Sequence, residues 1–225
     1  MENKFIYLVP GNWFELKNIN TEKIHPYDLD ALNEEIINQV NTRADKLSFI
    51  DISFGSKYTK CKIEDITMHI DPTKFDRIAK LLTKEKRHPI ITFHGTSHEA
   101  VQSILDHGYI IPGLEKNTNT GSVRIGVQKK HGSAYGVGIY SSPFFDKANY
   151  YTAAKNGFVY VLINMVFLGT LKMVPPGVGS ANTTSPTNGS YPDGSNTRIV
   201  YGLEQLVSAD SNRIVPVGVM KVSVN

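Results

Sequence analysis

Residues 89–108 read PIITFHGTSHEAVQSILDHG, and this stretch decides the fold of the second half of the chain. The apolar run at its start predicts a strand that stops at the His94-Gly95 pair. A helix is predicted to follow, with an apolar face formed by Val101, Ile104 and Leu105. Thr96 and Glu99 have the spacing of a capping box at its start, and Gly108 suits its end. A His-Gly pair at such a strand-to-helix turn can place an imidazole and a bare backbone against a ligand.

The composition is that of a globular chain. It has 225 residues, 40% of them hydrophobic, and a formal net charge of +3, which is too small to indicate nucleic acid as a partner. A single cysteine, Cys61, excludes an intrachain disulfide framework and a cysteine-based zinc cluster. The sequence shows no signal-peptide pattern and no apolar run long enough for a bilayer. We therefore expect a soluble intracellular protein, in the cytoplasm or nucleus, without a membrane partner or a metal site.

The pattern of strands and helices predicts two domains, residues 1–82 and 83–225. The first shows short strands around turn dipeptides and two amphipathic stretches, and the charged run TKEKRHP at 83–89 resembles a solvated linker. The second shows FVYVLINMVFLG at 158–169, a strand apolar on both faces and hence central in a sheet. Two further strands are predicted, TRIVYGLEQLV at 197–207 and RIVPVGVMKVSV at 213–224. The fold class is α+β, with each domain built on a mainly antiparallel sheet with few helices.

Four motifs follow one another in the second half of the chain, in an order and at a spacing that match a known family. They are FHGTSHEAVQSILDHG at 93–108, YGVGIYSSPFFDKANYY at 135–151, VYVLINMVFLG at 159–169 and NTRIVY at 196–201. In these motifs the chain resembles the poly(ADP-ribose) polymerase catalytic domain, whose fold is a split β-sheet. The resemblance implies an ADP-ribosyltransferase, a glycosyltransferase that uses NAD as its substrate.

The resemblance also implies roles for single residues. His94, Tyr140 and Thr197 match the positions of the family's catalytic triad, and Gly95, Thr96 and Tyr150 match positions that bind NAD. His94 would hydrogen-bond a ribose hydroxyl, the Gly95 backbone would meet the carboxamide, and the two tyrosines would pack around the nicotinamide ring. Each of these side chains taken alone fits a structural role as well, and only their joint order favours a site.

Thr197 stands where the polymerases carry a glutamate. Threonine can hydrogen-bond but cannot hold the negative charge that normally supports an oxocarbenium-like centre. The resemblance to members without this glutamate implies transfer of a single ADP-ribose unit to acceptor proteins, with the protein itself among the candidates. Lys147 lies near the position of a carboxamide-binding serine, which keeps open a catalytically inactive scaffold or an NAD- or ADP-ribose-binding protein.

Residues 1–82 resemble a WWE domain, in which Trp13 matches one anchoring aromatic residue. The resemblance implies recognition of ADP-ribose by this domain. The ligand-facing glutamine of such domains is replaced by Thr67 or Met68, neither of which offers an amide. Tyr58 and Arg77 are the remaining candidates for a diphosphate contact, and a packed tyrosine with a solvated arginine is the alternative.

Overall fold

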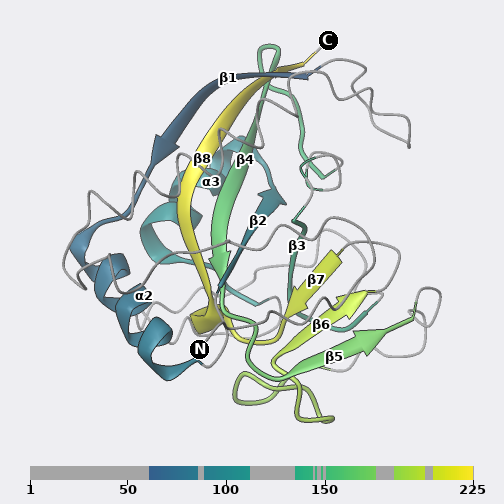
Figure 1. Cartoon of the computed structure of the whole chain (residues 1–225). Helices are drawn as coiled ribbons and strands as arrows, with labels where there is room; N and C mark the ends of the chain where they lie inside the picture. Colours follow the sequence, from purple (N-terminus) through teal and green to yellow (C-terminus); the bar gives the residue numbers. More distant parts are fainter. Residues whose placement is uncertain are drawn as a thin grey trace, which may run out of the picture.

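The computed structural model of the chain describes residues 61–85, 89–111, 135–143, 145, 148, 151–175, 185–200 and 205–224. This part of the chain is mostly β-structure, with two four-stranded sheets and two helices longer than one turn (Figure 1). The α+β class predicted from the sequence is confirmed for these residues.

The first sheet has the strand order β1-β8-β4-β2, and all of its neighbouring strands are antiparallel. Its strands are β1 (Cys61–Met68), β8 (Ile214–Val224), β4 (Phe158–Val166) and β2 (Ile90–Gly95). β4 is buried on both faces because Val161 and Ile163 pack in one cluster while Leu162 and Val166 pack in another. The predicted central strand at 158–169 is therefore confirmed, with its end at Val166.

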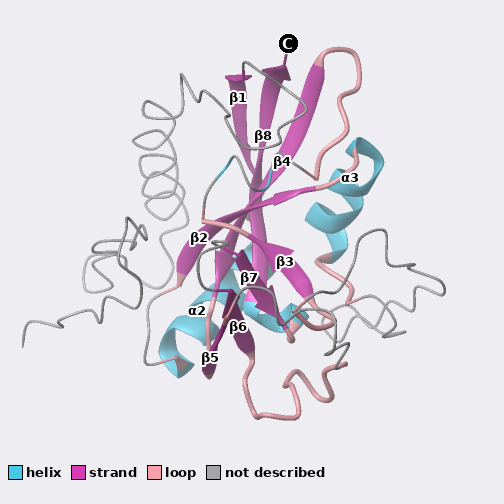
Figure 2. Ribbon diagram, turned by 90° about the vertical axis from the view of Figure 1, so that its right-hand side faces the viewer, coloured by secondary structure: helices cyan, strands magenta, loops and turns pink. Residues whose placement is uncertain are grey.

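The two helices cover opposite faces of this sheet (Figure 2). Helix α2 (Pro72–Lys84) places Phe75 and Ile78 against one face, and the side chain of Asp71 accepts a hydrogen bond from the Lys74 N–H at its start. Helix α3 (His98–His107) covers the other face. We call the cluster that it joins the α3-side core, which comprises Val101, Leu105, Tyr109, Ile111, Val137, Ile139, Leu162, Val166 and Ile214.

The predicted ends of α3 are half right. The helix is preceded by Ser97 as its N-cap, without a side-chain capping bond, so the capping box predicted at Thr96 and Glu99 is wrong. Gly108 ends the helix as predicted. Its φ of 74° lies in the region that favours glycine, and its N–H bonds the Ile104 carbonyl.

The second sheet has the order β3-β7-β6-β5, with one parallel pair, β5 with β6. Its strands are β3 (Ile139–Ser141), β7 (Gln205–Ser208), β6 (Thr197–Val200) and β5 (Leu171–Val174). The single strand predicted at 197–207 is wrong, because this segment forms two antiparallel strands with Thr197 opposite Ser208. A bridge between Phe93 and Ser142 joins the two sheets.

The predicted division of the chain at residue 82 is not confirmed by the described residues. β1 pairs with β8 along its length, and α2 packs into the same cluster as β2, β4 and β8. Residues 61–84 thus share a sheet and a core with the second half of the chain. Residues 1–60, which would hold most of a WWE-like domain including Trp13 and Tyr58, lie outside the described residues.

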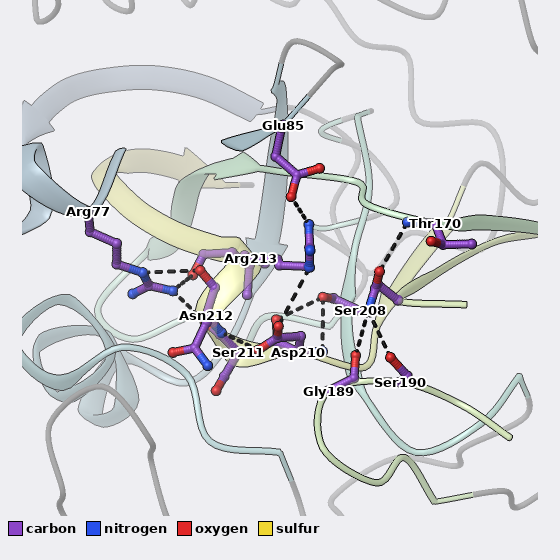
Figure 3. A network of polar contacts seen from close by, with 12 residues as sticks. Arg77, Glu85, Thr170, Gly189, Ser190, Ser208, Asp210, Ser211, Asn212 and Arg213 are labelled. Atoms are coloured by element: carbon purple, nitrogen blue, oxygen red, sulfur yellow. Dashed lines mark hydrogen bonds and ion pairs between the residues drawn. The ribbon is translucent and has the colours of Figure 1, made fainter. Parts of the chain in front are cut away.

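A polar network fixes α2 to the 3-10 turn η1 (Ser211–Arg213) that precedes β8 (Figure 3). Arg77 donates to the carbonyls of Ser211 at 2.6 Å and Asn212 at 3.1 Å. Burial lowers the pKa of Arg77 to about 10, although the negative charge of Asp210 acts to raise it. These backbone contacts do not fit the diphosphate contact predicted for Arg77. Glu85 forms an ion pair with Arg213 and its side chain is only 11% exposed, so the prediction of a solvated linker is wrong at this residue.

Candidate functional site

His94 lies one residue before the end of β2, where the two sheets meet. Its Nδ1 is 2.6 Å from the backbone carbonyl oxygen of Tyr140 on β3. A carbonyl oxygen only accepts hydrogen bonds, so Nδ1 is the donor in this contact, and in the neutral form of the ring the lone pair then lies on Nε2. The Tyr140 carbonyl therefore fixes the orientation of the His94 imidazole at the end of β2.

A buried tyrosine supports the His94 ring from the α3 side. The Tyr109 ring meets the imidazole edge-on, with 5.1 Å between ring centroids and an interplanar angle of 81°. The Tyr109 hydroxyl donates to Oδ1 of the fully buried Asn164 at 2.8 Å. Burial raises the pKa of Tyr109, although this hydrogen bond acts to lower it. Tyr109 is neutral at ordinary pH and acts here as a packing and hydrogen-bonding group.

Gly95 is required by the packing of the chain itself. A Cβ at this position would lie 1.9 Å from the Ala148 carbonyl oxygen and 3.0 Å from Cγ2 of Thr152. The lack of a side chain at Gly95 is thus required by the close approach of Ala148 and Thr152, and a contact of its backbone with a carboxamide stays a prediction. Thr96, next in the chain, is half-buried between β2 and α3.

Tyr140 is half-buried, and its hydroxyl contacts the turn that precedes β3. The hydroxyl donates to the Gly136 carbonyl at 2.9 Å and accepts from the Tyr135 N–H at 3.0 Å. Burial raises the pKa of Tyr140, and the hydrogen bond from Tyr135 opposes this shift. The ring of Tyr140 is consequently fixed by its own chain, and its phenol is protonated at neutral pH.

Thr197 is completely buried, and its hydroxyl has no hydrogen-bond partner among the described residues. The strand register places Tyr140 opposite Val207 and Val207 opposite Arg198, while Ile139 and Thr197 both lie opposite Ser208. Cross-strand neighbours point to the same face of a sheet. The side chains of Tyr140 and Thr197 therefore lie on opposite faces.

The face of Thr197 is the one shared with His94. Ile139, on that face, packs in the α3-side core with Leu162, and Leu162 is the cross-strand partner of His94. The structure thus joins His94 to the backbone of Tyr140, turns Thr197 toward the interior, and leaves the Tyr140 side chain on the other face of the second sheet.

Two of the residues singled out in the sequence, Tyr150 and Lys147, lie outside the described part of the chain. Within the described residues, no group of three or more His, Cys, Asp or Glu side chains is arranged to hold a metal ion. No helix found there is both long and apolar enough to cross a membrane.

The sequence analysis missed a buried charge beside Thr197. Arg198 has a side-chain exposure of 9%, lies 3.8 Å from the centroid of the Tyr191 ring and forms an ion pair with Asp193 at 2.9 Å. Burial favours the neutral form of Asp193, but hydrogen bonds from Ser195, Lys172 and Arg198 outweigh it and hold the pKa of Asp193 below its ordinary value of 3.8. The available signal was an arginine directly before the apolar residues Ile199 and Val200 in a predicted strand.

Comparison with known proteins supports the fold alone. No protein-family model and no curated protein matches the chain. Among solved structures the chain is similar to the PARP domain of Arabidopsis RADICAL-INDUCED CELL DEATH1, with a TM-score of 0.56, 14% sequence identity, and coverage of 83% of this chain and 98% of that one. The protein therefore has a PARP-like fold, which confirms the ADP-ribosyltransferase-type architecture expected from the four motifs.

Proposed function

We propose that the protein is an NAD-dependent mono-ADP-ribosyltransferase that modifies protein side chains and releases nicotinamide. The observation that carries the proposal is His94, held in the Nδ1–H tautomer at the junction of the two sheets of a PARP-like fold. With its lone pair on Nε2, the imidazole is suited to accept a hydrogen bond from a ribose hydroxyl of NAD. Tyr140 and Tyr150 would contact the nicotinamide ring.

In the proposed reaction the bond between ribose C1″ and the nicotinamide nitrogen breaks. The electron pair goes to nicotinamide, which leaves as a neutral molecule, and C1″ gains oxocarbenium character. A carboxylate oxygen of the acceptor protein then forms the new bond to C1″. Thr197 is buried and uncharged, so it supplies neither the charge that supports this centre nor the base that activates a hydroxyl for chain growth. A single ADP-ribose unit is the expected product.

A second candidate is a protein that binds NAD or ADP-ribose without turning NAD over. It is favoured by the register that puts the side chains of Tyr140 and Thr197 on opposite faces of the second sheet. It is also favoured because the Tyr140 hydroxyl is already hydrogen-bonded to the backbone of residues 135 and 136.

One experiment separates the two candidates. The full chain is incubated with NAD labelled in the adenosine half, with an added acceptor protein, and both protein-bound label and free nicotinamide are measured. The variant is His94→Ala, and the control is His107→Ala at the exposed end of α3. Calorimetric titration of NAD into each protein measures binding without turnover.

Single-unit labelling in the wild type that His94→Ala abolishes and His107→Ala retains supports the transferase. Binding of NAD without labelling or nicotinamide release supports the second candidate. Long ADP-ribose polymers, or labelling that survives His94→Ala unchanged, contradict the proposed function.

A further inference from the structure

The face of the second sheet that carries Tyr140 also carries a buried arginine. Lys172 on β5 lies beside Arg198 on β6, and Arg198 and Tyr140 both lie opposite Val207 on β7. These four residues form one cross-strand row and point to the same face. Arg198 is thus separated from Tyr140 by a single valine.

Arg198 reaches the turn that holds Tyr140. Its Nη1 donates to the Tyr135 carbonyl at 3.1 Å, and the N–H of the same Tyr135 donates to the Tyr140 hydroxyl at 3.0 Å. The Tyr140 hydroxyl then donates to Gly136. Arg198 therefore holds Tyr135, and Tyr135 in turn holds the Tyr140 hydroxyl.

The other half of the guanidinium fixes Arg198 itself. Nη2 bonds Asp193, whose carboxylate also accepts from the Ser195 hydroxyl, and the guanidinium lies over the Tyr191 ring. The Tyr191 hydroxyl in turn donates to the Val137 carbonyl at 3.0 Å. Arg198 and Tyr191 thus bond the carbonyls on either side of Gly136, those of Tyr135 and Val137.

This contact explains Gly136 of the GVGIY motif, and it contributes at Gly138, where an added Cβ would also lie 2.6 Å from the Ser208 carbonyl oxygen. A Cβ at Gly136 would lie 2.9 Å from both Nη1 of Arg198 and Cε1 of Tyr191, and a Cβ at Gly138 would lie 2.7 Å from the Tyr191 hydroxyl. Gly136 also has a φ of 112°, which side chains rarely adopt. The turn is therefore built to close on the Arg198–Tyr191 pair.

We propose that Arg198 is a positioning residue that sets the orientation of the Tyr140 ring, and through it the affinity of the site for the nicotinamide half of NAD. This inference rests on the proposed function, in which Tyr140 contacts that ring. A buried ion pair often adds little net stability compared with apolar residues of the same size. A guanidinium that bonds both Asp193 and the turn is expected to act mainly on geometry, and lysine cannot make both contacts with one planar group.

The test measures two halves of the ligand separately. Nicotinamide and ADP-ribose are titrated by calorimetry into the wild type, Arg198→Lys and Lys172→Gln. The last variant is a matched control, because Lys172 also bonds the Asp193 carboxylate but, among the described residues, does not bond the 135–137 turn. Hydrogen exchange of the peptide that spans residues 135–140 reports on the Tyr135 N–H without any ligand.

In Arg198→Lys we expect about tenfold weaker binding of nicotinamide, the loss of one charged hydrogen bond, with binding of ADP-ribose within about twofold of the wild type. The 135–140 peptide should exchange faster in this variant and remain unchanged in Lys172→Gln. Equal weakening of both ligands, or exchange in Arg198→Lys equal to that of the wild type, overturns the inference. If the wild type binds neither ligand the proposed function fails, and an unchanged exchange rate then rejects the positioning role separately.

Discussion

Replacement of Gly95 by alanine is predicted to be costly for a reason that is visible in one distance. The new Cβ would lie 1.9 Å from the Ala148 carbonyl oxygen, and Cβ atoms essentially never come closer than 3.0 Å to a heavy atom outside their own and neighbouring residues, so about 1.1 Å (3.0 − 1.9) must be gained by displacement. The obstacle is backbone, which cannot rotate away as a side chain can. Overpacking of this kind costs about 1–3 kcal/mol, and a backbone obstacle favours the upper end, about 3 kcal/mol.

The expected loss is measurable by thermal unfolding. For a chain of this size each kcal/mol lowers Tm by about 2–4 °C, so Gly95→Ala should lower it by about 6–12 °C. The matched control is Gly157→Ala. Gly157 has a φ of 78° and no heavy atom within 4 Å of the added Cβ, so this change introduces conformational strain alone, about 1 kcal/mol and about 2–4 °C.

Comparison of the two Tm values separates a steric clash from backbone strain. Gly95 has the conformation of a β-strand residue in β2, so its loss of stability would come from the steric clash and not from backbone strain. A Tm for Gly95→Ala that equals the wild type, or that falls no further than the Tm of Gly157→Ala, would refute the packing of the Ala148 carbonyl against Gly95.

Three other substitutions test the remaining contacts. Arg77→Gln should lower the free energy of unfolding in urea by about 2–4 kcal/mol, because the buried guanidinium of Arg77 bonds carbonyls of the turn before β8. The control Lys80→Gln, on the exposed side of α2, should change this free energy by less than about 0.5 kcal/mol. Thr197→Val should leave stability unchanged or raise it by up to about 1 kcal/mol, since the hydroxyl has no partner among the described residues, and a loss above about 1 kcal/mol would show that it has one. Asp193→Asn tests a pH dependence: the folded pKa of Asp193 lies below 3.8, so the wild type should be more stable than the variant at pH 7 and lose this advantage as the pH falls below about 4. Parallel stability curves for the two proteins between pH 7 and pH 3 would contradict the ion pair.

Periodicity and apolar content predicted the first sheet well. β2 and β4 follow from apolar runs, and β4 is central because both of its faces are apolar. α3 follows from the spacing of Val101 and Leu105, and its end follows from Gly108. These signals are local, so they can be read without knowledge of the tertiary contacts.

The errors arose where a distant contact overrides a local pattern. The charged run after α2 looked solvated, but Glu85 meets Arg213 from the other end of the chain. The run at 197–207 looked like one strand, and its division into β6 and β7 depends on pairing that the local pattern does not encode. The faces on which Tyr140 and Thr197 lie depend on the same register, which motif order does not encode.

Chain order has a consequence for how the first sheet is made. β8 follows every other described strand in the sequence, yet it occupies an inner position, between β1 and β4. During synthesis on the ribosome those two strands must wait with exposed hydrogen-bonding edges until the last eleven-residue strand emerges and inserts between them. Nascent chains halted before residue 214 should therefore be prone to aggregation and to capture by chaperones.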